Sequence, residues 1–266
     1  MIAPAPTTRL SSRAAAGPAP LWRLRVYEEL PSTQDVVLRA AEAGEPEGLA
    51  VLARRQTAGR GREGRGWESP AGNLHLSVLL RPREPVRRAA QWALLAAVAL
   101  AEAIEPYLPP ACSGGPALEL KWPNDVLLGG AKLAGILVEA ATGPQGGLAW
   151  LALGIGANLA HAPVLPGGRP TASLAAMGVS PPPAPEAFAG ELLVALGRWR
   201  RVQERQGFAP VRSAWLARGP RQGTPLAIAG RAAAGTFAGL DEDGSLLLAG
   251  PDGEIRAWRA GEVETG

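Results

Sequence analysis

Residues 56–67 read Gln-Thr-Ala-Gly-Arg-Gly-Arg-Glu-Gly-Arg-Gly-Trp, and this alternation of glycine with arginine decides how the chain on either side is interpreted. Glycine lets the backbone approach a ligand closely, while arginine offers a planar fork of hydrogen-bond donors. The combination favours a loop that binds a carboxylate or a phosphate. It is not a P-loop, because it does not end in Gly-Lys-Ser or Gly-Lys-Thr. A disordered nucleic-acid-binding tail is the alternative that composition leaves open.

Strand patterns on both sides of this loop argue against a disordered tail. Apolar runs at residues 49–53 and 73–80 are typical of strands. Before them, the alternating run at residues 21–26 predicts a first strand, and Ser32 begins a near capping box for a short helix that Gly44 ends. The glycine- and arginine-rich stretch is therefore expected to be an ordered loop between two strands.

Beyond the loop the pattern predicts one long helix and several strands joined by short turns. The Ala-rich run at residues 89–104 is interrupted by Gln91 and Glu102, so it predicts a buried helix and not a membrane span. Strand-like runs follow at residues 118–122, 136–138 and 148–155, with a Gly129-Gly130 turn. Short turns between adjacent strands imply mainly antiparallel pairing.

The last third of the chain predicts two more helices and then a small β module. Apolar residues at helical spacing mark residues 188–199, and a shorter helix is expected at residues 211–216. From Thr224 onward short strands are separated by turns that include Asp243-Gly244 and Asp252-Gly253, which are strong hairpin signals. A module of about forty residues is near the lower limit for independent folding, so we expect it to pack on the main domain.

Composition excludes several classes of site. With 266 residues and 47% hydrophobic content the chain can bury a sizeable core, and its net charge of +3 gives no argument for a nucleic-acid or membrane partner. One cysteine excludes an intramolecular disulfide framework and multi-thiolate zinc sites. Residues 1–20 have no apolar signal core, so we expect a disordered tail and a cytoplasmic protein.

A second informative stretch is Lys-Trp-Pro-Asn-Asp at residues 121–125, followed by Lys-Leu-Ala-Gly-Ile-Leu-Val-Glu at residues 132–139. Pro123 ends a strand, and the following Asn and Asp also fit simple turn chemistry. Lys132 opens an otherwise apolar run, so a buried position there needs an anionic partner. A solvated strand end is the other interpretation of this lysine.

These motifs, in this order, resemble the biotin protein ligase family. Ser-Thr-Gln at residues 32–34 resembles the family's Ser-Thr-Asn segment, and Gly-Ile-Gly-Ala-Asn at residues 154–158 resembles its glycine-rich strand. The resemblance runs from about Leu21 to the end. Gln34 stands where asparagine is commoner, and Glu63 stands where a basic residue is frequent. The chain before Leu21 is too short for the winged helix-turn-helix of some relatives, so we expect a monofunctional ligase with no DNA partner.

The resemblance implies an α+β fold. Its main part, expected at residues 21–219, is a catalytic domain with a mixed sheet like that of class II aminoacyl-tRNA synthetases, and residues 220–266 are expected to form an SH3-like barrel. The implied reaction uses ATP with Mg²⁺ to convert biotin into biotinyl-5′-adenylate. Biotin is then transferred to a lysine of a biotin carboxyl carrier domain of an acyl-CoA or pyruvate carboxylase. The implied assembly is a monomer or a homodimer, with no membrane partner.

Site residues are carried over by the same correspondence. Lys132 and Arg62 are the implied catalytic residues, with Lys132 bridging carboxylate and α-phosphate oxygens. The implied biotin-binding residues are Ser32, Thr33, Gln34, Gln56, Gly61, Arg62, Glu63, Lys132 and Gly135. The implied ATP-binding residues are Arg65, Trp67, Asn124, Asp125 and Asn158. No residue is assigned as a metal ligand.

Two rival functions remain open at this point. A lipoate protein ligase, which also forms an acyl adenylate, would use a lysine in the same way but would lack the Gly-Arg-Gly-Arg segment. A non-catalytic protein that binds nucleic acid or another ligand would use the basic loop and the tryptophans without turnover. His75 and His161 have no carboxylate partner at a suitable spacing and are interpreted as structural, and Cys112 is assigned no role.

Overall fold

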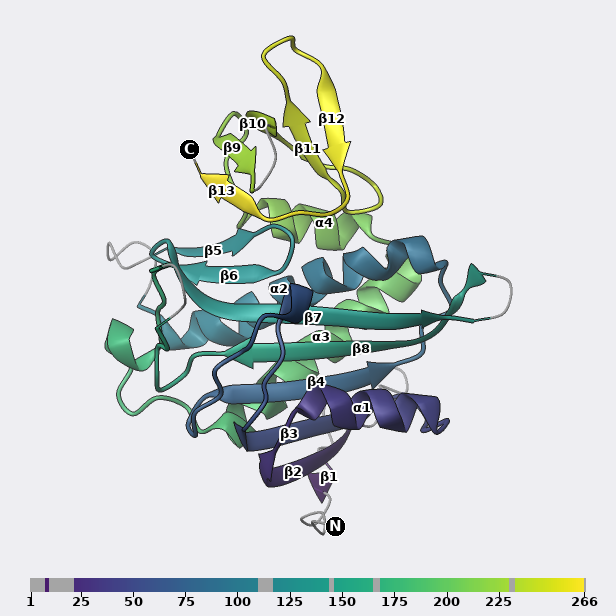
Figure 1. The fold of residues 1–266 in the computed structure, drawn as a ribbon, viewed down its shortest axis with the longest axis vertical. Helices are drawn as coiled ribbons and strands as arrows, with labels where there is room; N and C mark the ends of the chain where they lie inside the picture. The colour runs from purple at the N-terminus through teal and green to yellow at the C-terminus, as the bar shows by residue number, and fades with distance from the viewer. Residues whose placement is uncertain are drawn as a thin grey trace.

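The chain folds into two sheets, and most of the contacts between helices and strands are made by the larger one. The structure is a computed structural model, and it describes residues 8–9, 22–109, 117–143, 146–164, 168–229 and 233–265. Within these residues an eight-stranded sheet carries helices on both faces, and a five-stranded sheet lies at one end of the molecule (Figure 1). Cys112 lies outside the described residues.

The large sheet is mixed and mainly antiparallel, as predicted. Its strand order is β1-β2-β3-β4-β8-β7-β6-β5. Only β2 and β3 pair in parallel among the described strands, and α1 (Thr33–Glu42) supplies the crossover that a parallel pair needs. The strands are β1 Thr8–Arg9, β2 Arg23–Leu30, β3 Leu49–Gln56, β4 Leu74–Leu80, β5 Leu118–Lys121, β6 Asp125–Leu128, β7 Ala131–Thr142 and β8 Leu148–Ala157.

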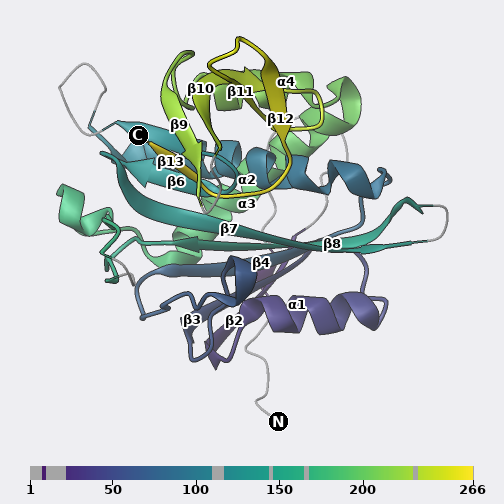
Figure 2. The same cartoon turned by 45° about the horizontal axis from the view of Figure 1, so that its top comes forward.

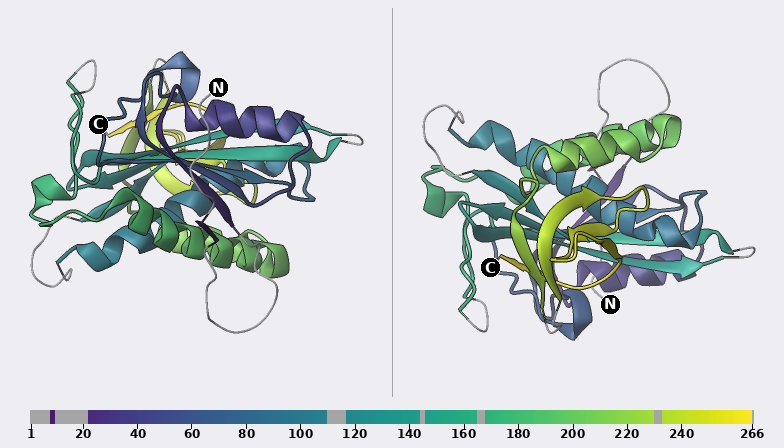
Figure 3. Two further views of the ribbon diagram at one scale, coloured as in Figure 1. Left: turned by 90° about the horizontal axis from the view of Figure 1, so that it is seen from below. Right: turned by 90° about the horizontal axis from the view of Figure 1, so that it is seen from above.

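Helices cover the two faces of this sheet unequally. α1 packs alone against β3, β4 and β8, while α2 (Ala89–Ile104) and α3 (Pro185–Gln206) cover the opposite face (Figure 3). Side chains alternate along each strand, so Leu76 and Val78 of β4 join the core under α2 and α3, and Leu79 joins the core under α1. No helix in the described part of the chain is long and apolar enough to cross a membrane.

Two local expectations need correction. Ser32 is the N-cap of α1, but its side chain makes no capping hydrogen bond. The predicted disordered tail is wrong for Thr8–Arg9, which forms β1 opposite Leu24 and Arg23 of β2. The edge of β2 would otherwise present unpaired backbone groups, and β1 satisfies some of them. The other residues of the predicted tail lie outside the described part of the chain.

The five-stranded sheet follows α4 (Ala209–Leu216) and is built from hairpins (Figure 2). Gly244 and Gly253 adopt φ of 89° and 80° in the two Asp-Gly turns that the sequence predicts. The sheet packs on the main domain as expected, because Trp122 Nε1 donates to the Gly244 carbonyl at 3.1 Å. Its strands are β9 Pro225–Ile228, β10 Ala233–Leu240, β11 Leu246–Ala249, β12 Ile255–Trp258 and β13 Val263–Thr265, in the order β12-β11-β10-β9-β13.

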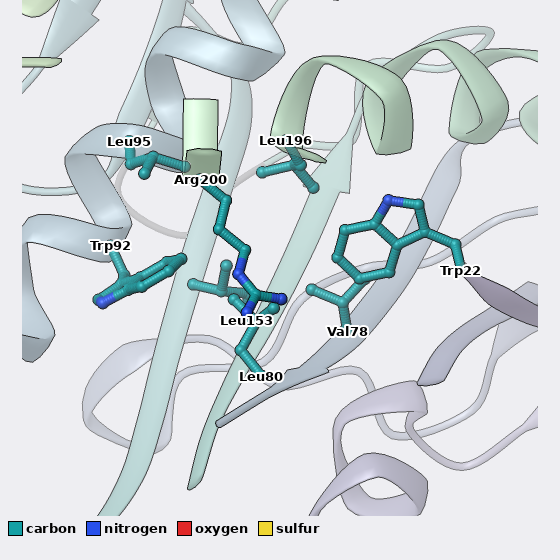
Figure 4. Close-up of a pocket in the computed structure, with 8 residues that line it drawn as sticks. All are labelled: Trp22, Val78, Leu80, Trp92, Leu95, Leu153, Leu196 and Arg200. Carbon is teal, nitrogen blue, oxygen red and sulfur yellow. The ribbon is translucent and has the colours of Figure 1, made fainter. Parts of the chain in front are cut away.

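A nearly buried arginine lies in the core under α3. Figure 4 shows Arg200 between the indoles of Trp22 and Trp92. Its side chain is 11% exposed and bonds to Glu47 at 3.0 Å and Glu204 at 2.7 Å. Burial disfavours the charged guanidinium, but the hydrogen bonds to Glu47 and Glu204 outweigh that effect and raise the pKa of Arg200. The ion pair with Glu47 therefore ties α3 to the turn before β3, while the pair with Glu204 lies within α3.

Replacing Arg200 by methionine should leave the free energy of unfolding within about 1 kcal/mol of the parent's, because the charge and its desolvation cost disappear together. Glu47→Ala should cost about 2 kcal/mol, since the buried charge then loses one partner. Urea unfolding followed by circular dichroism measures both values. A larger loss from Arg200→Met than from Glu47→Ala would contradict this account.

Candidate functional site

A row of four residues crosses the α1 face of the large sheet beyond the N-terminal end of that helix. His75 of β4 pairs with Gly156 of β8, Gly156 with Gly135 of β7, and Gly135 with Asp125 of β6. Directly paired residues of antiparallel strands point to the same face. The middle of this row therefore has no side chains, and we call Gly135 and Gly156 the glycine floor.

Trp67 lies over the glycine floor. A Cβ atom on Gly156 would lie 2.4 Å from Trp67 Cε2, and one on Gly135 would lie 3.1 Å from Trp67 Cζ3. The indole therefore fits only because both positions are glycine. Trp67 Nε1 is buried and has no hydrogen-bond partner among the described residues. An unpaired buried donor of this kind indicates a place where a ligand can bind.

Positive charge gathers at the β6 and β7 end of the row. Lys132 Nζ lies 2.7 Å from Asp125 Oδ1, which is the anionic partner that the sequence predicts for this lysine. The same ammonium lies 5.6 Å from the centroid of the Trp67 ring. Arg62 reaches this end from the loop and donates to Asn124 Oδ1 at 3.0 Å. Two cations thus stand beside the glycine floor, ready to receive an anionic group.

Polar groups that bear no charge gather at the opposite end. Gln56 Oε1 accepts from the backbone N–H of Thr33 at 2.8 Å and lies 3.1 Å from the Thr33 hydroxyl. The Thr33 and Ser77 hydroxyls are 2.8 Å apart. Gln56 Nε2 donates to Ser69 Oγ at 2.8 Å. Hydroxyls and a carboxamide offer both donors and acceptors, so this end suits a neutral polar group.

Two further buried groups at this end lack partners. Ser32 Oγ and Gln34 Oε1 are both buried with no hydrogen bond among the described residues. Gln34 Nε2 donates weakly, at 3.4 Å, to the Ala152 carbonyl. A Cβ on Gly154 would lie 2.8 Å from Gln34 Oε1, so the carboxamide lies directly on the strand. Ser32, Thr33, Gln34 and Gln56 are therefore brought together as the sequence predicts.

The loop between β3 and β4 folds tightly around its glycines. A Cβ on Gly59 would lie 2.3 Å from the Trp67 carbonyl oxygen, and Gly61 N–H donates to the Arg65 carbonyl at 2.7 Å. Glu63 adopts φ of 56° in the short 3₁₀ turn η1 (Arg62–Gly64), and its side chain is 66% exposed. No contact brings Gly61 or Glu63 to the row of four residues within the described chain.

Arg65 makes one ion pair with Glu63 of the loop, at 3.6 Å, and a shorter one with the C-terminal module. Its guanidinium lies 2.9 Å from Glu262, just before β13, and Arg169 pairs with the same carboxylate. Burial disfavours the charged carboxylate, but the hydrogen bonds from Arg169 and Arg65 outweigh that effect and lower the pKa of Glu262. Arg65 is thus held between the loop and the small sheet.

Asn158 lies at the end of β8 and bonds to backbone. Its Nδ2 donates to the Ala172 carbonyl at 3.0 Å and to the Lys132 carbonyl at 3.4 Å. The side chain is buried, so these bonds hold the start of β7 beside the segment that contains Ala172. A role of Asn158 toward ATP stays a prediction.

The analysis of the sequence interpreted His75 as structural and gave no role to Ser77 or Ser69, although all three lie near this site. His75 is 1% exposed, its Nε2 lies 3.1 Å from the Pro70 carbonyl, and its Nδ1 has no partner among the described residues. Burial lowers the pKa of His75, which favours the neutral imidazole. His75 and Ser77 are alternate residues of an otherwise apolar strand, a spacing that places both on one face. No comparable pattern in the sequence indicates that Ser69 belongs to the site.

Comparison with known proteins identifies the class to which this fold and site belong. Residues 26–158 match the Biotin/lipoate A/B protein ligase family, and residues 227–266 match the biotin protein ligase C terminal domain. The chain therefore belongs to the biotin/lipoate A/B protein ligase family. A biotin--[acetyl-CoA-carboxylase] ligase of Paracoccus denitrificans is 46% identical over 210 residues, which are 76% of this chain and 85% of that protein. Within the family, the chain is thus a biotin protein ligase.

Solved structures agree with this assignment. The biotin protein ligase from Aquifex aeolicus in complex with biotin and ATP has a TM-score of 0.73 and 26% identity, and the match covers 91% of this chain and 97% of that one. The biotin protein ligase from Leishmania major in complex with biotinyl-5-AMP has a TM-score of 0.60 and 26% identity over 89% and 98%. The expected fold class, with its synthetase-like sheet and SH3-like C-terminal domain, is confirmed.

Gly59→Ala should loosen the loop, because the new Cβ would lie 2.3 Å from the Trp67 carbonyl oxygen. We expect hydrogen exchange of residues 56–69 to rise about tenfold, which corresponds to a local loss of about 1.4 kcal/mol. Gly66→Ala is the matched control, since a Cβ there has no neighbour within 4 Å. Equal exchange in the two variants would disprove the close approach.

Proposed function

We propose that the glycine floor and its two unlike ends bind biotin in the reaction of this biotin protein ligase, which activates biotin with ATP and transfers it to a lysine of a carrier protein. The observation that carries the proposal is the arrangement of the ends. Neutral hydrogen-bonding groups at Thr33 and Gln56 lie at one end, and Lys132 with Arg62 lies at the other. Biotin has a neutral ureido ring at one end and a carboxylate at the other.

The substrate fits this face group by group. The ureido ring would form hydrogen bonds with Ser32, Thr33, Gln34 and Gln56. Two of these groups, Ser32 Oγ and Gln34 Oε1, have no hydrogen-bond partner among the described residues. The apolar ring and chain would lie on the glycine floor, where backbone is directly accessible once Trp67 moves. The carboxylate would then meet Lys132. Polar groups at the ends thus fix the orientation of an otherwise apolar ligand.

In the first step a carboxylate oxygen of biotin attacks the α-phosphorus of ATP, an O–P bond forms, and the bond to the β-phosphate oxygen breaks to release pyrophosphate. Both reactants are anions, so fixed positive charge is needed to bring them together. Lys132 would bridge the carboxylate and the α-phosphate oxygens, with Arg62 beside it. Asp125 would hold the ammonium in place through their ion pair.

Residues on the ATP side would act mainly by position. Trp67 would cover the adenylate. Asn124 holds Arg62 while its own Nδ2 donates to the Ile136 carbonyl at 2.7 Å. Arg65 would reach the phosphates by leaving Glu262. Asn158 would act indirectly, through the backbone of Lys132. Gly61 and Glu63 would approach biotin only when the loop closes.

Mg²⁺ would neutralise phosphate charge when it is bound with ATP. The described residues contain no group of three or more His, Cys, Asp or Glu side chains that could hold a metal ion. Mg²⁺ usually keeps several waters and is bound by one or two carboxylates together with substrate phosphates. Asp125, whose side chain is 12% exposed beside Lys132, is the carboxylate that fits such an ion.

In the second step the acceptor lysine amine attacks the acyl carbon of the adenylate, a C–N bond forms, the C–O bond to AMP breaks, and the amine loses a proton. The mixed anhydride must be kept from water until then. The loop at residues 59–67 is the proposed lid, since it lies over the floor through Trp67. The acceptor is a biotin carboxyl carrier domain, and we propose that it belongs to an acyl-CoA or pyruvate carboxylase. We further propose that the reaction takes place in the cytoplasm and that the ligase is a monomer or a homodimer.

Lys132→Ala and Arg62→Ala should each lower transfer of labelled biotin to a purified carrier domain at least about a hundredfold, because each removes a charge that stabilises the transition state. Arg198→Ala is the control, since that exposed arginine of α3 pairs with Glu102 of α2 on the opposite face of the sheet. Thermal unfolding checks that the variants fold. If the parent enzyme shows no biotin-dependent exchange of pyrophosphate into ATP, or shows it with lipoate instead, the proposed substrate is wrong.

Saturating biotin with ATP should slow amide hydrogen exchange across residues 59–67, because the loop then closes over a ligand. The amides of α2 serve as the internal reference, since that helix is buried and packs on the opposite face of the sheet. Mass spectrometry of peptic fragments measures both regions. Unchanged exchange in the loop would argue that residues 59–67 are not the lid.

A further inference from the structure

A chain of hydrogen bonds runs from the start of α1 to the backbone of Trp67. Thr33 donates to Gln56 Oε1, Gln56 Nε2 donates to Ser69 Oγ at 2.8 Å, and Ser69 Oγ donates to the Trp67 carbonyl at 3.0 Å. Gln56 N–H also donates to the Ser69 carbonyl at 3.3 Å. Ser69 therefore joins the neutral polar end of the site to the residue that lies on the glycine floor.

Most hydrogen-bond donors and acceptors of the Gln56 carboxamide are already in use. Its oxygen has two lone pairs, and the backbone N–H and hydroxyl of Thr33 lie within reach of both. Its nitrogen has two hydrogens, of which Ser69 takes one. A ureido group that donates to Oε1 must therefore replace Thr33, and a bond to Nε2 must share the amide with Ser69. Occupancy of this end consequently changes the position of Gln56.

The atoms around Ser69 are closely packed, so Gln56 cannot shift without moving its neighbours. A Cβ on Gly59 would lie 2.6 Å from Ser69 Oγ, 3.0 Å from Gln56 Nε2 and 2.3 Å from the Trp67 carbonyl. Ser69 itself is 7% exposed, so water does not substitute for these bonds. A shift of Gln56 is therefore transmitted to the backbone of Trp67.

We infer that Ser69 is a positioning residue that moves Trp67 in response to the group bound at Gln56. This inference rests on the proposed function, because that group is taken to be the ureido ring of biotin. Trp67 lies on the floor, where the rest of biotin would bind. Binding at Gln56, acting through Ser69, displaces the indole from the floor and presents it to the adenine of ATP. Biotin therefore raises the affinity for the nucleotide.

The hydroxyl is essential to this role because it accepts one bond and donates the next. Ser69→Ala removes both bonds, and Ser69→Thr keeps a hydroxyl in the same place. Ser77→Ala is the matched control. Its hydroxyl lies 2.8 Å from that of Thr33, at the far end of the chain of hydrogen bonds, and it makes no direct bond to Gln56, Ser69 or Trp67 among the described residues.

The test is the ratio of two dissociation constants for α,β-methylene-ATP, measured by calorimetry without biotin and with saturating biotin. We expect biotin to tighten nucleotide binding at least about fivefold in the parent. In Ser69→Ala the ratio should fall to within about twofold of one, and Ser69→Thr should restore it. Ser77→Ala should bind biotin more weakly but keep the parent's ratio at saturation.

A parent ratio of one, or a parent-like ratio in Ser69→Ala, would overturn the inference while leaving the ligase activity intact. If Ser69→Ala does not fold, Ser69→Cys takes its place, and its weakly bonding thiol should also lower the ratio. A parent-like ratio in Ser69→Cys would then overturn the inference. Failure of the parent to bind biotin would remove the proposed function itself, and the calorimetric titration with biotin alone separates that outcome.

Discussion

Absence of side chains at two paired positions is the constraint on which the site depends. Gly135 and Gly156 are neighbours on adjacent strands, and a methyl group on Gly156 would overlap the Trp67 indole. Strand register fixes how far this bare backbone extends and which residues stand at its ends. The register of the strands thus determines which side chains stand at each end of the glycine floor. The loop at residues 59–67 covers the floor through Trp67.

Charge in the site is balanced before any substrate is present. Lys132 is about one-quarter exposed and already faces Asp125, so the ammonium does not lie buried without a partner. An incoming carboxylate exchanges one anionic partner for another, which avoids the cost of creating a new buried charge. At the other end the groups without partners are neutral, so leaving them unpaired costs less than an unpaired ion would.

Sequence patterns predict the elements well and the connections between distant residues poorly. The α2 boundaries, the Asp-Gly hairpins and the need of Lys132 for an anion all follow from local chemistry, and the structure bears them out. The pairing of Arg65 with Glu262 joins residues 197 positions apart, and no local pattern encodes it. β1 was missed because two polar residues have no strand periodicity and pair only because an edge is available.

The Glu262 carboxylate gives the small C-terminal sheet a part in the arrangement of the candidate site. It holds Arg65 of the loop and Arg169 of a second segment, so three parts of the chain meet at one side chain. The two folding units consequently cannot change independently. If the C-terminal module is exchanged between relatives, the conformation of the loop will be preserved only if the new module has a carboxylate at this position. The interface therefore restricts which catalytic domain and C-terminal module of two ligases can be combined.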